Sequence, residues 1–357
     1  SSPLLVDLDY DGKLDIVTAD TSGRIYAFKH DGTPLWTVNV SVAVPLLPAQ
    51  VRAGVTLGAT FGNPAVDSSA AAGDVDGDGE IDIVIGVGAR APGVNPGQGG
   101  IVVISRLGVV KRFIYSFDIR AFVDPQNSKD GFTESVYATP VLANIDSDPE
   151  LEIMAGALDN LLYAWNGDGS LAYQKDDDND GKLDEDGFGD QTPYTPFNFD
   201  DDFPGIRFVD DNGDGLVDNS SAADDDEDTL LDEDYPEWPF NARDTVLASA
   251  VAWDINGDGT KELIFGHDYS GGVNQEFARG GVLRVLTPQG QQVAGFPKGN
   301  LEQVVWSSPV VVDLDNDGQY EIIHGTGLDL SDVSGVVNGN AVGQLVHAWR
   351  ASGAPYI

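Results

Sequence analysis

The sequence predicts an all-β fold, and three observations support this prediction. Short β-branched and aromatic runs alternate with turns rich in glycine and aspartate, which is typical of β-strands. No stretch has the sustained apolar periodicity of an amphipathic helix. One pattern of strands and turns recurs five times along the 357 residues. Four antiparallel strands repeated around an axis make a β-propeller, so we expect a β-propeller of four-stranded antiparallel blades with five repeats visible.

Each repeat opens with a short apolar strand that runs into an acidic loop. The five openings begin at Ser1, Ser68, Ala138, Ala248 and Ser307. The loops begin at Asp7, Asp74, Asn144, Asp254 and Asp313, at intervals of 67, 70, 110 and 59 residues. Three of these intervals are similar, as expected of blades, and the interval of 110 residues requires an insertion.

Three further strands complete each predicted blade. In the first repeat they are Leu14–Ala19, Arg24–Phe28 and a looser segment from Thr33, with a glycine turn before the last. The second strands of the other repeats are expected to start at Ile81, Leu151, Lys261 and Tyr320, and the third at Ile101, Leu161, Val282 and Leu345. Gln291 is expected to open the fourth segment of the fourth repeat.

The insertion falls in the third blade. Residues 175–235 contain 23 acidic and three basic residues, a net charge of −20. Strand character returns only near Trp238–Phe240. We therefore expect a propeller formed by residues 1–174 and 236–357, with residues 175–235 as an Asp-rich calcium-binding insertion within the outer strand of blade three.

The acidic loops have the form D-x-D-x-D-G-x-x-D/E, which suits a hard cation. Side-chain oxygens at positions 1, 3, 5 and 9 and a backbone carbonyl at position 7 can surround one ion, and calcium accepts 6–8 such ligands. Glycine at position 6 permits a left-handed turn, but the third loop has Pro149 there, so we expect its turn to differ. The predicted ligands of the blade loops are Asp7, Asp9, Asp11, Lys13 and Asp15; Asp74, Asp76, Asp78, Glu80 and Asp82; Asn144, Asp146, Asp148, Glu150 and Glu152; Asp254, Asn256, Asp258, Thr260 and Glu262; and Asp313, Asp315, Asp317, Gln319 and Glu321.

The insertion repeats this spacing three times. Its predicted ligands are Asp176, Asp178, Asp180, Lys182 and Asp184; Asp210, Asn212, Asp214, Leu216 and Asp218; and Asp224, Asp226, Asp228, Leu230 and Asp232. The segment is too acidic and too poor in apolar residues to fold unaided, so calcium would form its core. The alternative is a solvated acidic spacer without metal. Altogether we expect about five to eight calcium ions.

The blade loops have two alternative interpretations, an EF-hand and an acidic turn without metal. An EF-hand shares positions 1 to 6 but needs Glu at position 12 and flanking helices. Position 12 is Thr18, Ile85, Phe265 or His324 in four loops, and the flanks are strands, so this interpretation fails. Solvated acidic turns without metal are the second alternative, but clustered carboxylates in a hairpin are costly without a cation.

At this point the sequence resembles the FG-GAP/VCBS repeat proteins, which include the integrin alpha-subunit propellers. The resemblance covers residues 1–174 and 236–357 and rests on five calcium-type loops at blade spacing, with Phe61-Gly62 as a weaker sign. It implies calcium in the loop between the first two strands of a blade. The insertion resembles the Asp-rich calcium repeats of secreted bacterial proteins and thrombospondins.

Composition limits the partners. The formal net charge is −40, from 59 acidic and 19 basic residues, so nucleic acid and anionic membrane surfaces are disfavoured. No apolar run approaches the ~20 residues of a membrane span. Cysteine is absent, which excludes disulfides and thiolate metal sites.

An enzyme or lectin is the alternative class. His267 and His324 follow second strands, and with Arg90, Asp268, Tyr269, Arg279 and Asp329 they could line a pocket on the loop face opposite the calcium, in loops 86–100, 266–281 and 325–344. His30 and His347, and the tryptophans Trp36, Trp165 and Trp349, are more readily explained by turn and blade packing. No catalytic constellation is recognisable, so we expect no enzyme, and a carbohydrate-binding or polysaccharide-active protein stays the second hypothesis.

We therefore expect an extracellular or cell-surface, calcium-stabilised module. Its role would be adhesion, a structural role or surface assembly, with other protein subunits, cell-surface or matrix ligands or glycans as partners, and a homo-oligomer or filament as one form. Residues 356 and 357 fall early in a fourth strand, so we expect an incomplete last blade whose open edge pairs with another chain.

Overall fold

The computed structural model shows an all-β chain. It describes residues 2–40, 65–88, 99–116, 133–146, 148–172, 238–242, 244–269, 280–301, 303–328 and 345–356. Within these ranges there is no helix, and hence none that is long and apolar enough to cross a membrane. The strands form four sheets of four antiparallel strands, one of three and one of two.

Each of the larger sheets is one repeat of the sequence. Blade one contains β1 (Leu4–Val6), β2 (Asp15–Ala19), β3 (Arg24–Phe28) and β4 (Pro34–Asn39). Blade two contains β5 (Ala70–Gly73), β6 (Asp82–Val87), β7 (Gly100–Ser105) and β8 (Val110–Tyr115). Blade three contains β9 (Val141–Ala143), β10 (Glu152–Gly156), β11 (Leu161–Trp165) and β12 (Phe240–Asn241). Blade four contains β13 (Val251–Trp253), β14 (Glu262–Tyr269), β15 (Gly280–Leu286) and β16 (Lys298–Leu301). Blade five contains β18 (Val310–Val312), β19 (Glu321–Gly325) and β21 (Val346–Arg350).

The turn after the third strand is the same in every blade. In blade one the Lys29 amide donates to Thr33 O at 2.8 Å, and the Gly32 amide donates to Lys29 O at 2.8 Å. The equivalent glycines have φ between 71° and 89°, a left-handed conformation that costs glycine little. They are Gly32, Gly108, Gly169, Gly290 and Gly353. This shared turn fixes the first and third loops of each blade at the same end.

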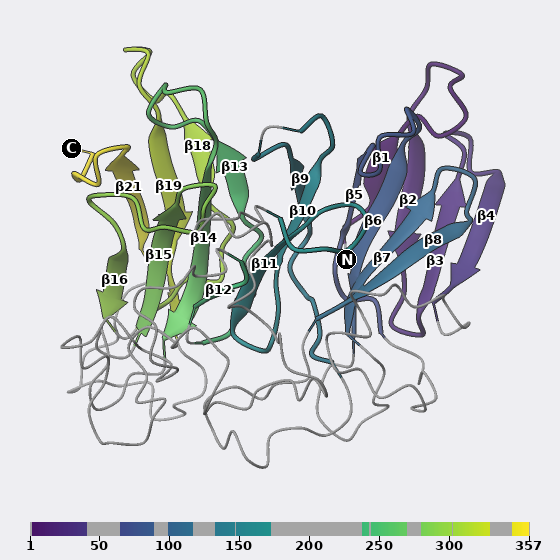
Figure 1. Ribbon diagram of the computed structural model, residues 1–357, viewed down its shortest axis with the longest axis horizontal. Helices are drawn as coiled ribbons and strands as arrows, with labels where there is room; N and C mark the ends of the chain where they lie inside the picture. The colour runs from purple at the N-terminus through teal and green to yellow at the C-terminus, as the bar shows by residue number, and fades with distance from the viewer. Residues whose placement is uncertain are drawn as a thin grey trace, which may run out of the picture.

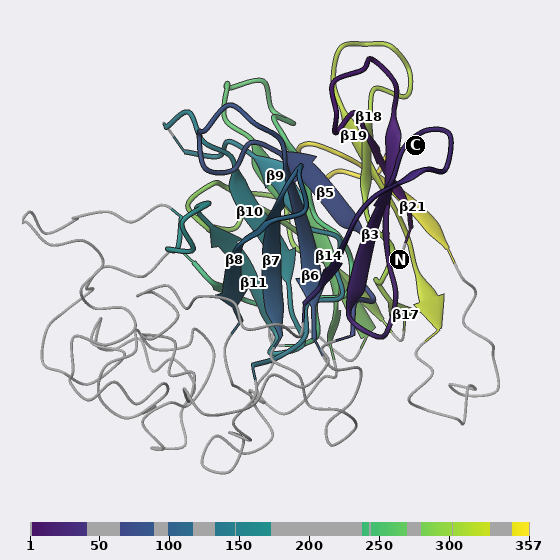
Figure 2. The ribbon, with the colours of Figure 1, turned by 90° about the vertical axis from the view of Figure 1, so that its right-hand side faces the viewer.

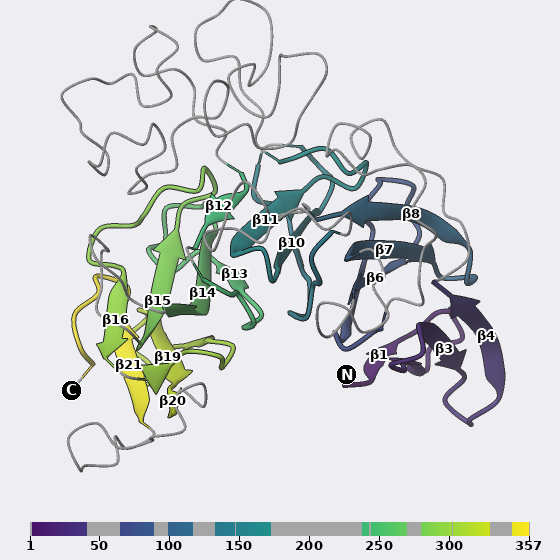
Figure 3. The ribbon, with the colours of Figure 1, turned by 90° about the horizontal axis from the view of Figure 1, so that it is seen from below.

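The five sheets stand in an arc, and blades one and five lie at its two ends (Figure 3). The core consists of four apolar clusters, one at each contact between successive blades. Val17 and Ile25 of blade one, for example, pack against Ile83 and Ile85 of blade two, and these residues are at most 1% exposed. The described residues therefore give a propeller-like stack of blades in an open arc.

Blade three is completed from both sides of residues 173–237. Leu171 forms a bridge with Trp165, and the Ala172 amide donates to Ala164 O at 2.9 Å. Farther along the chain, Phe240–Asn241 pairs with Leu161 and Leu162. Trp238, 1% exposed, packs in the cluster between blades three and four. The predicted insertion itself, residues 175–235, lies wholly within 173–237, outside the described residues.

Three details differ from the predicted strands. The outer strand of blade four starts at Lys298 and not at Gln291, because residues 294 and 295 form a turn. Blade five has three strands within the described ranges. In place of a fourth strand, these ranges contain only an isolated bridge between Trp349 and Pro355. A further pair, β17 (Gln303–Val304) with β20 (Gly327–Leu328), was not predicted.

Candidate metal sites in the blade loops

The predicted loops join the first two strands of each blade and lie together on one face of the arc, at the top of Figures 1 and 2. In four of the five loops an aspartate at position 1 organises the turn by accepting backbone N–H groups. In blade one Asp7 accepts from the Asp11 amide at 3.1 Å and from the Gly12 amide at 2.9 Å. Asp313 does the same with Asp317 and Gly318, at 3.1 and 3.0 Å. The loops are therefore preformed hairpin turns.

Two positions in the loops are left-handed. Position 6 has φ of 82–95° at Gly12, Gly79, Gly259 and Gly318, as the sequence predicts. Position 4 was not singled out in the sequence, yet its φ is 59–77° at Tyr10, Gly77, Gly257 and Asn316. Asparagine and glycine tolerate this conformation, which gives the sequence a signal in three of the four loops.

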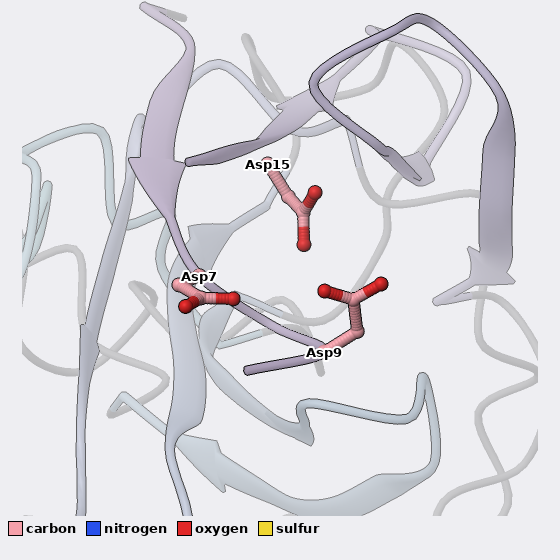
Figure 4. A group of neighbouring side chains, drawn as sticks. All are labelled: Asp7, Asp9 and Asp15. Atoms are coloured by element: carbon pink, nitrogen blue, oxygen red, sulfur yellow. The ribbon is translucent and has the colours of Figure 1, made fainter. Parts of the chain in front are cut away.

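The predicted carboxylates come together in four of the five blades. In each, three residues offer carboxylate oxygens that lie within 4.8 Å of one another. The groups are Asp7, Asp9 and Asp15; Asp74, Asp76 and Asp78; Asp146, Asp148 and Glu152; and Asp313, Asp315 and Glu321. Figure 4 shows the first group with its three carboxylates around one space. The loop with Pro149 is among the four, so the different residue at position 6 does not prevent the cluster.

The carboxylate at position 9 begins the second strand and is buried. In blade three Glu152 Oε2 accepts the Ile145 N–H at 2.6 Å, and in blade five Glu321 Oε2 accepts the Leu314 N–H at 3.0 Å. Both residues are 0% exposed. The second oxygen of each, Oε1, is buried and accepts no hydrogen bond. These two atoms are the strongest sign that the clusters are built for a ligand, because a buried carboxylate oxygen without a donor is costly.

The electrostatics of the empty cluster are unfavourable in blade three. Burial first, and then the charges of Asp146 and Asp148, raise the pKa of Glu152 from 4.5 to about 7. Burial likewise raises the pKa of Glu262 in blade four. A cation would reverse both effects, since it stabilises the ionised carboxylates.

Basic side chains enter three of the loops. Lys29 Nζ lies 2.6 Å from Asp9 Oδ2 in blade one, and this hydrogen bond lowers the pKa of Asp9. Arg350 Nη1 of blade five is 3.8 Å from Asp317 and 3.9 Å from Glu321. In blade two Lys111 contacts three carboxylates at once. Burial alone would lower the pKa of Lys111, but hydrogen bonds from its ammonium to these carboxylates raise it.

Blade four differs in that an amide occupies its cluster. Asn256 Nδ2 donates to Glu262 Oε1 at 2.8 Å and to Asp258 Oδ2 at 3.0 Å. Asp254 still accepts the Gly259 N–H at 2.9 Å, so the turn itself is preserved. A rotation of the Asn256 amide would present its oxygen to a cation in place of the donor.

Several predicted site residues play another part or lie elsewhere. The residue at position 7 of each loop was predicted to offer its backbone carbonyl. In the structure it also donates its own N–H to the carboxylate at position 5, at 2.8–2.9 Å. These residues are Lys13, Glu80, Glu150, Thr260 and Gln319. Asn144 donates to the Asp148 carbonyl. The three predicted loops of the insertion, between Asp176 and Asp232, lie outside the described residues.

The predicted pocket around His267 and His324 is wrong for both histidines. They are 0% and 1% exposed. His267 stacks on Phe265, on the face of β14 toward blade three, and His324 shares with Ile322 the face of β19 toward blade four. His267 Nε2 accepts from Arg284 Nε at 3.0 Å, and His324 Nε2 accepts from Trp349 Nε1 at 3.2 Å. Burial lowers the pKa of both. The side chains of Arg90, Tyr269, Arg279 and Asp329 and most of the three predicted loops lie outside the described residues.

Comparison with known proteins gives matches in structure but not in sequence. No family model matches the chain, and no curated protein sequence matches it. The C-terminal domain of PilY1 from Pseudomonas aeruginosa aligns with a TM-score of 0.38 at 9% identity, over 96% of this chain and 60% of that one. A quinohemoprotein alcohol dehydrogenase from Comamonas testosteroni aligns with a TM-score of 0.41 at 10% identity, over 98% and 59%. A europium-containing methanol dehydrogenase gives 0.39 at 12% identity, over 98% and 57%. This chain thus spans less than two thirds of each of these structures.

Proposed function

We propose that the five blade loops bind calcium and that the chain is an extracellular, calcium-stabilised β-propeller module of the FG-GAP/VCBS type. Its role is structural, in adhesion or in assembly at a surface. The observation that carries the proposal is Glu152 Oε1, a buried carboxylate oxygen that accepts no hydrogen bond in a cluster of like charges. Glu321 Oε1 also accepts no hydrogen bond, and its charged neighbour Arg350 Nη1 is 3.9 Å away. A cation would coordinate both oxygens and offset the repulsion.

The donor set favours calcium over other metals. The clusters supply carboxylate oxygens, and no histidine or cysteine belongs to them among the described residues. Hard oxygen ligands suit calcium and magnesium, and magnesium demands a tighter octahedron that usually keeps several waters. A loop that offers four side chains and one carbonyl is better matched to the 6–8 flexible ligands of calcium.

Charge supports an extracellular setting. Five ions would change the formal net charge from −40 to −30, and eight would change it to −24. Extracellular calcium modules work at about 10⁻⁴–10⁻³ M calcium, a level that the cytosol does not supply. A chain without cysteine cannot use disulfides, so in this setting its cross-links would be metal ions.

A role in assembly is supported by the two ends of the arc. Leu5 on β1 is 57% exposed, and Val310 and Val346 of blade five are 56% and 78% exposed. In blades two to four the equivalent strand residues, such as Ala72, Leu142 and Ala252 at the position of Leu5, pack against a neighbouring blade. Partners of these faces would be other protein subunits, either copies of this chain or surface proteins.

Metal analysis tests the calcium proposal directly. After dialysis in calcium and removal of free ions, we expect at least three tightly held calcium ions per chain, and Glu321→Gln should lose one of them. Asp31→Asn is the matched control, because Asp31 is an exposed carboxylate in the β3–β4 turn that accepts the Thr33 N–H at 2.9 Å and belongs to no cluster. Fewer than three ions in the wild type would refute the proposal.

Assembly is tested by light scattering and electron microscopy across a calcium titration. We expect larger particles as calcium rises, because bound ions reduce the repulsion between chains. A strictly monomeric particle at saturating calcium would leave the calcium sites in place but would refute assembly of this chain with itself.

A further inference from the structure

Lys111 holds the acidic loop of blade two from a different strand. It belongs to the outer strand β8, and its Nζ lies 3.0 Å from Asp76 Oδ2, 2.8 Å from Asp78 Oδ2 and 2.8 Å from Asp82 Oδ1. The Lys111 side chain is only 20% exposed. The ammonium group donates hydrogen bonds to Asp76 and Asp78, and the Asp82 carboxylate lies within ion-pair distance of it.

The three carboxylates are positions 3, 5 and 9 of the loop. Asp76 and Asp78 belong with Asp74 to the carboxylate cluster of this blade, and Asp82 is the ligand predicted at position 9. Ammonium and metal would therefore compete for the same oxygens. Asp82 is 0% exposed, and burial raises its pKa although Lys111 opposes the effect. Without Lys111 or a metal ion, the loop would hold a buried carboxylate beside two others, which is unfavourable.

Blade two is the only one with a lysine at this place in the sequence. Lys111 is the third residue after the turn glycine Gly108, and the equivalent residues of the other blades are Leu35, Ala172, Val293 and Tyr356. In blade three the cluster of Asp146, Asp148 and Glu152 has no basic side chain within 4.0 Å among the described residues. Lys261 reaches the third loop only at its Asn144 carbonyl, at 3.3 Å. The repeat therefore contains one carboxylate cluster with an ammonium group in contact and one without.

We propose that Lys111 is an intramolecular competitor for metal in blade two: its ammonium occupies the loop of the metal-free protein, and calcium has to displace it. The inference rests on the proposed function. As a consequence the second loop fills at higher calcium concentration than the third, and its filling releases Lys111 toward solvent. In blade two calcium replaces the single positive charge of the ammonium group with two, so the charge within the loop rises by one. In blade three no ammonium leaves, and the charge within the loop rises by two.

The displacement is tested on the wild-type protein by amine acetylation and mass spectrometry. In the metal-free protein the bound ammonium of Lys111 is a poor nucleophile, so we expect slow acetylation. Across a calcium titration the acetylation rate of Lys111 should rise about tenfold or more, as expected if the lysine holds the loop for about nine-tenths of the time without metal. The reference is Lys298, whose Nζ lies 5.0 Å from the Trp349 ring, and its acetylation rate should not change with calcium.

The competition is tested by calorimetric calcium titration of Lys111→Met. One weak site should become about tenfold tighter, while the number of ions stays the same. Arg24→Met is the matched control, because it removes the same charge from the exposed start of β3, at the end of blade one away from the loops. Methionine keeps most of the apolar length of the lysine chain.

The outcomes separate this inference from the calcium proposal. If neither protein binds calcium, the proposed function fails. If the wild type binds calcium but Lys111 acetylation is constant while all sites fill, or if Lys111→Met and Arg24→Met shift the isotherm equally, the competitor role is overturned and calcium binding stands.

Discussion

Replacement of Glu152 by glutamine should change protein stability in opposite directions with and without calcium. In the metal-free protein Glu152 is 0% exposed, and its pKa is about 7 instead of 4.5. Because the folded-state pKa is raised, the ionised form weakens folding above pH 7, and this penalty disappears as the pH falls toward 4.5. The difference in pKa corresponds to about 3 kcal/mol, at about 1.4 kcal/mol for each tenfold change.

Glutamine removes the charge and keeps the shape. Its carbonyl oxygen can still accept the Ile145 N–H, and its amide can donate to Asp146 or Asp148. We therefore expect metal-free Glu152→Gln to be more stable than the wild type by about 3 kcal/mol at pH 8 and by less than about 1 kcal/mol at pH 5. With saturating calcium the same change removes a ligand, and a site filled to about 100 times its Kd contributes about 2.7 kcal/mol. The variant should then be the less stable protein.

Urea unfolding followed by tryptophan fluorescence measures both effects. The four conditions are pH 8 and pH 5, each with chelator and with calcium. Glu150→Gln is the matched control, since Glu150 belongs to the same loop but offers only its backbone carbonyl to the predicted site. A loss of stability in Glu152→Gln that is equal with chelator and with calcium would refute the reasoning, because it would mean that the carboxylate is needed without metal.

Three further predictions follow from the same contacts. Thermal melts in calcium and in chelator should differ widely, because each site filled to about 100 times its Kd adds about 2.7 kcal/mol; coincident melts would contradict the calcium proposal. Gly108→Ala should lose about 1–3 kcal/mol in urea unfolding, since φ is +80° and the new Cβ would lie 2.6 Å from Trp36 Cγ. Gly32→Ala, with φ of +86° and open space around it, should lose less, and an equal loss would exclude the contact with Trp36 as the cause. Calcium should increase particle size in light scattering, and a constant size would argue against self-assembly.

The repeat predicted most of the fold because each blade uses the same local chemistry. Alternating apolar runs specified the strands, and a glycine three or four residues after the third strand specified the turn in every blade. Four of the five predicted acidic loops bring three carboxylates together. These features depend on neighbours within about ten residues, which a sequence pattern records directly.

What the repeat could not predict depends on contacts between distant residues. Lys111 follows Asp78 by 33 residues. It reaches the acidic loop between β5 and β6 because the sheet order β5-β6-β7-β8 places β8 only two strands from β6. The buried histidines were misassigned for a similar reason. Their position after a predicted second strand suggested that they belong to a loop. In the structure His324 still pairs with His347 in the sheet, so the strand continues through it and its side chain is buried. The open arc, too, concerns blades that are far apart in the chain.

Contacts between adjacent loops make the five sites unequal. Arg106 donates to the Leu8 carbonyl of the first loop at 3.3 Å, and its guanidinium lies 4.7 Å from the Tyr10 ring. The same side chain pairs with Glu80 of the second loop. A change of shape or charge in one of these loops should therefore affect the other, because Arg106 contacts both. The motif describes five similar sites, and under the proposed function we expect residues outside the motif, such as Arg106 and Lys111, to determine the order in which they fill.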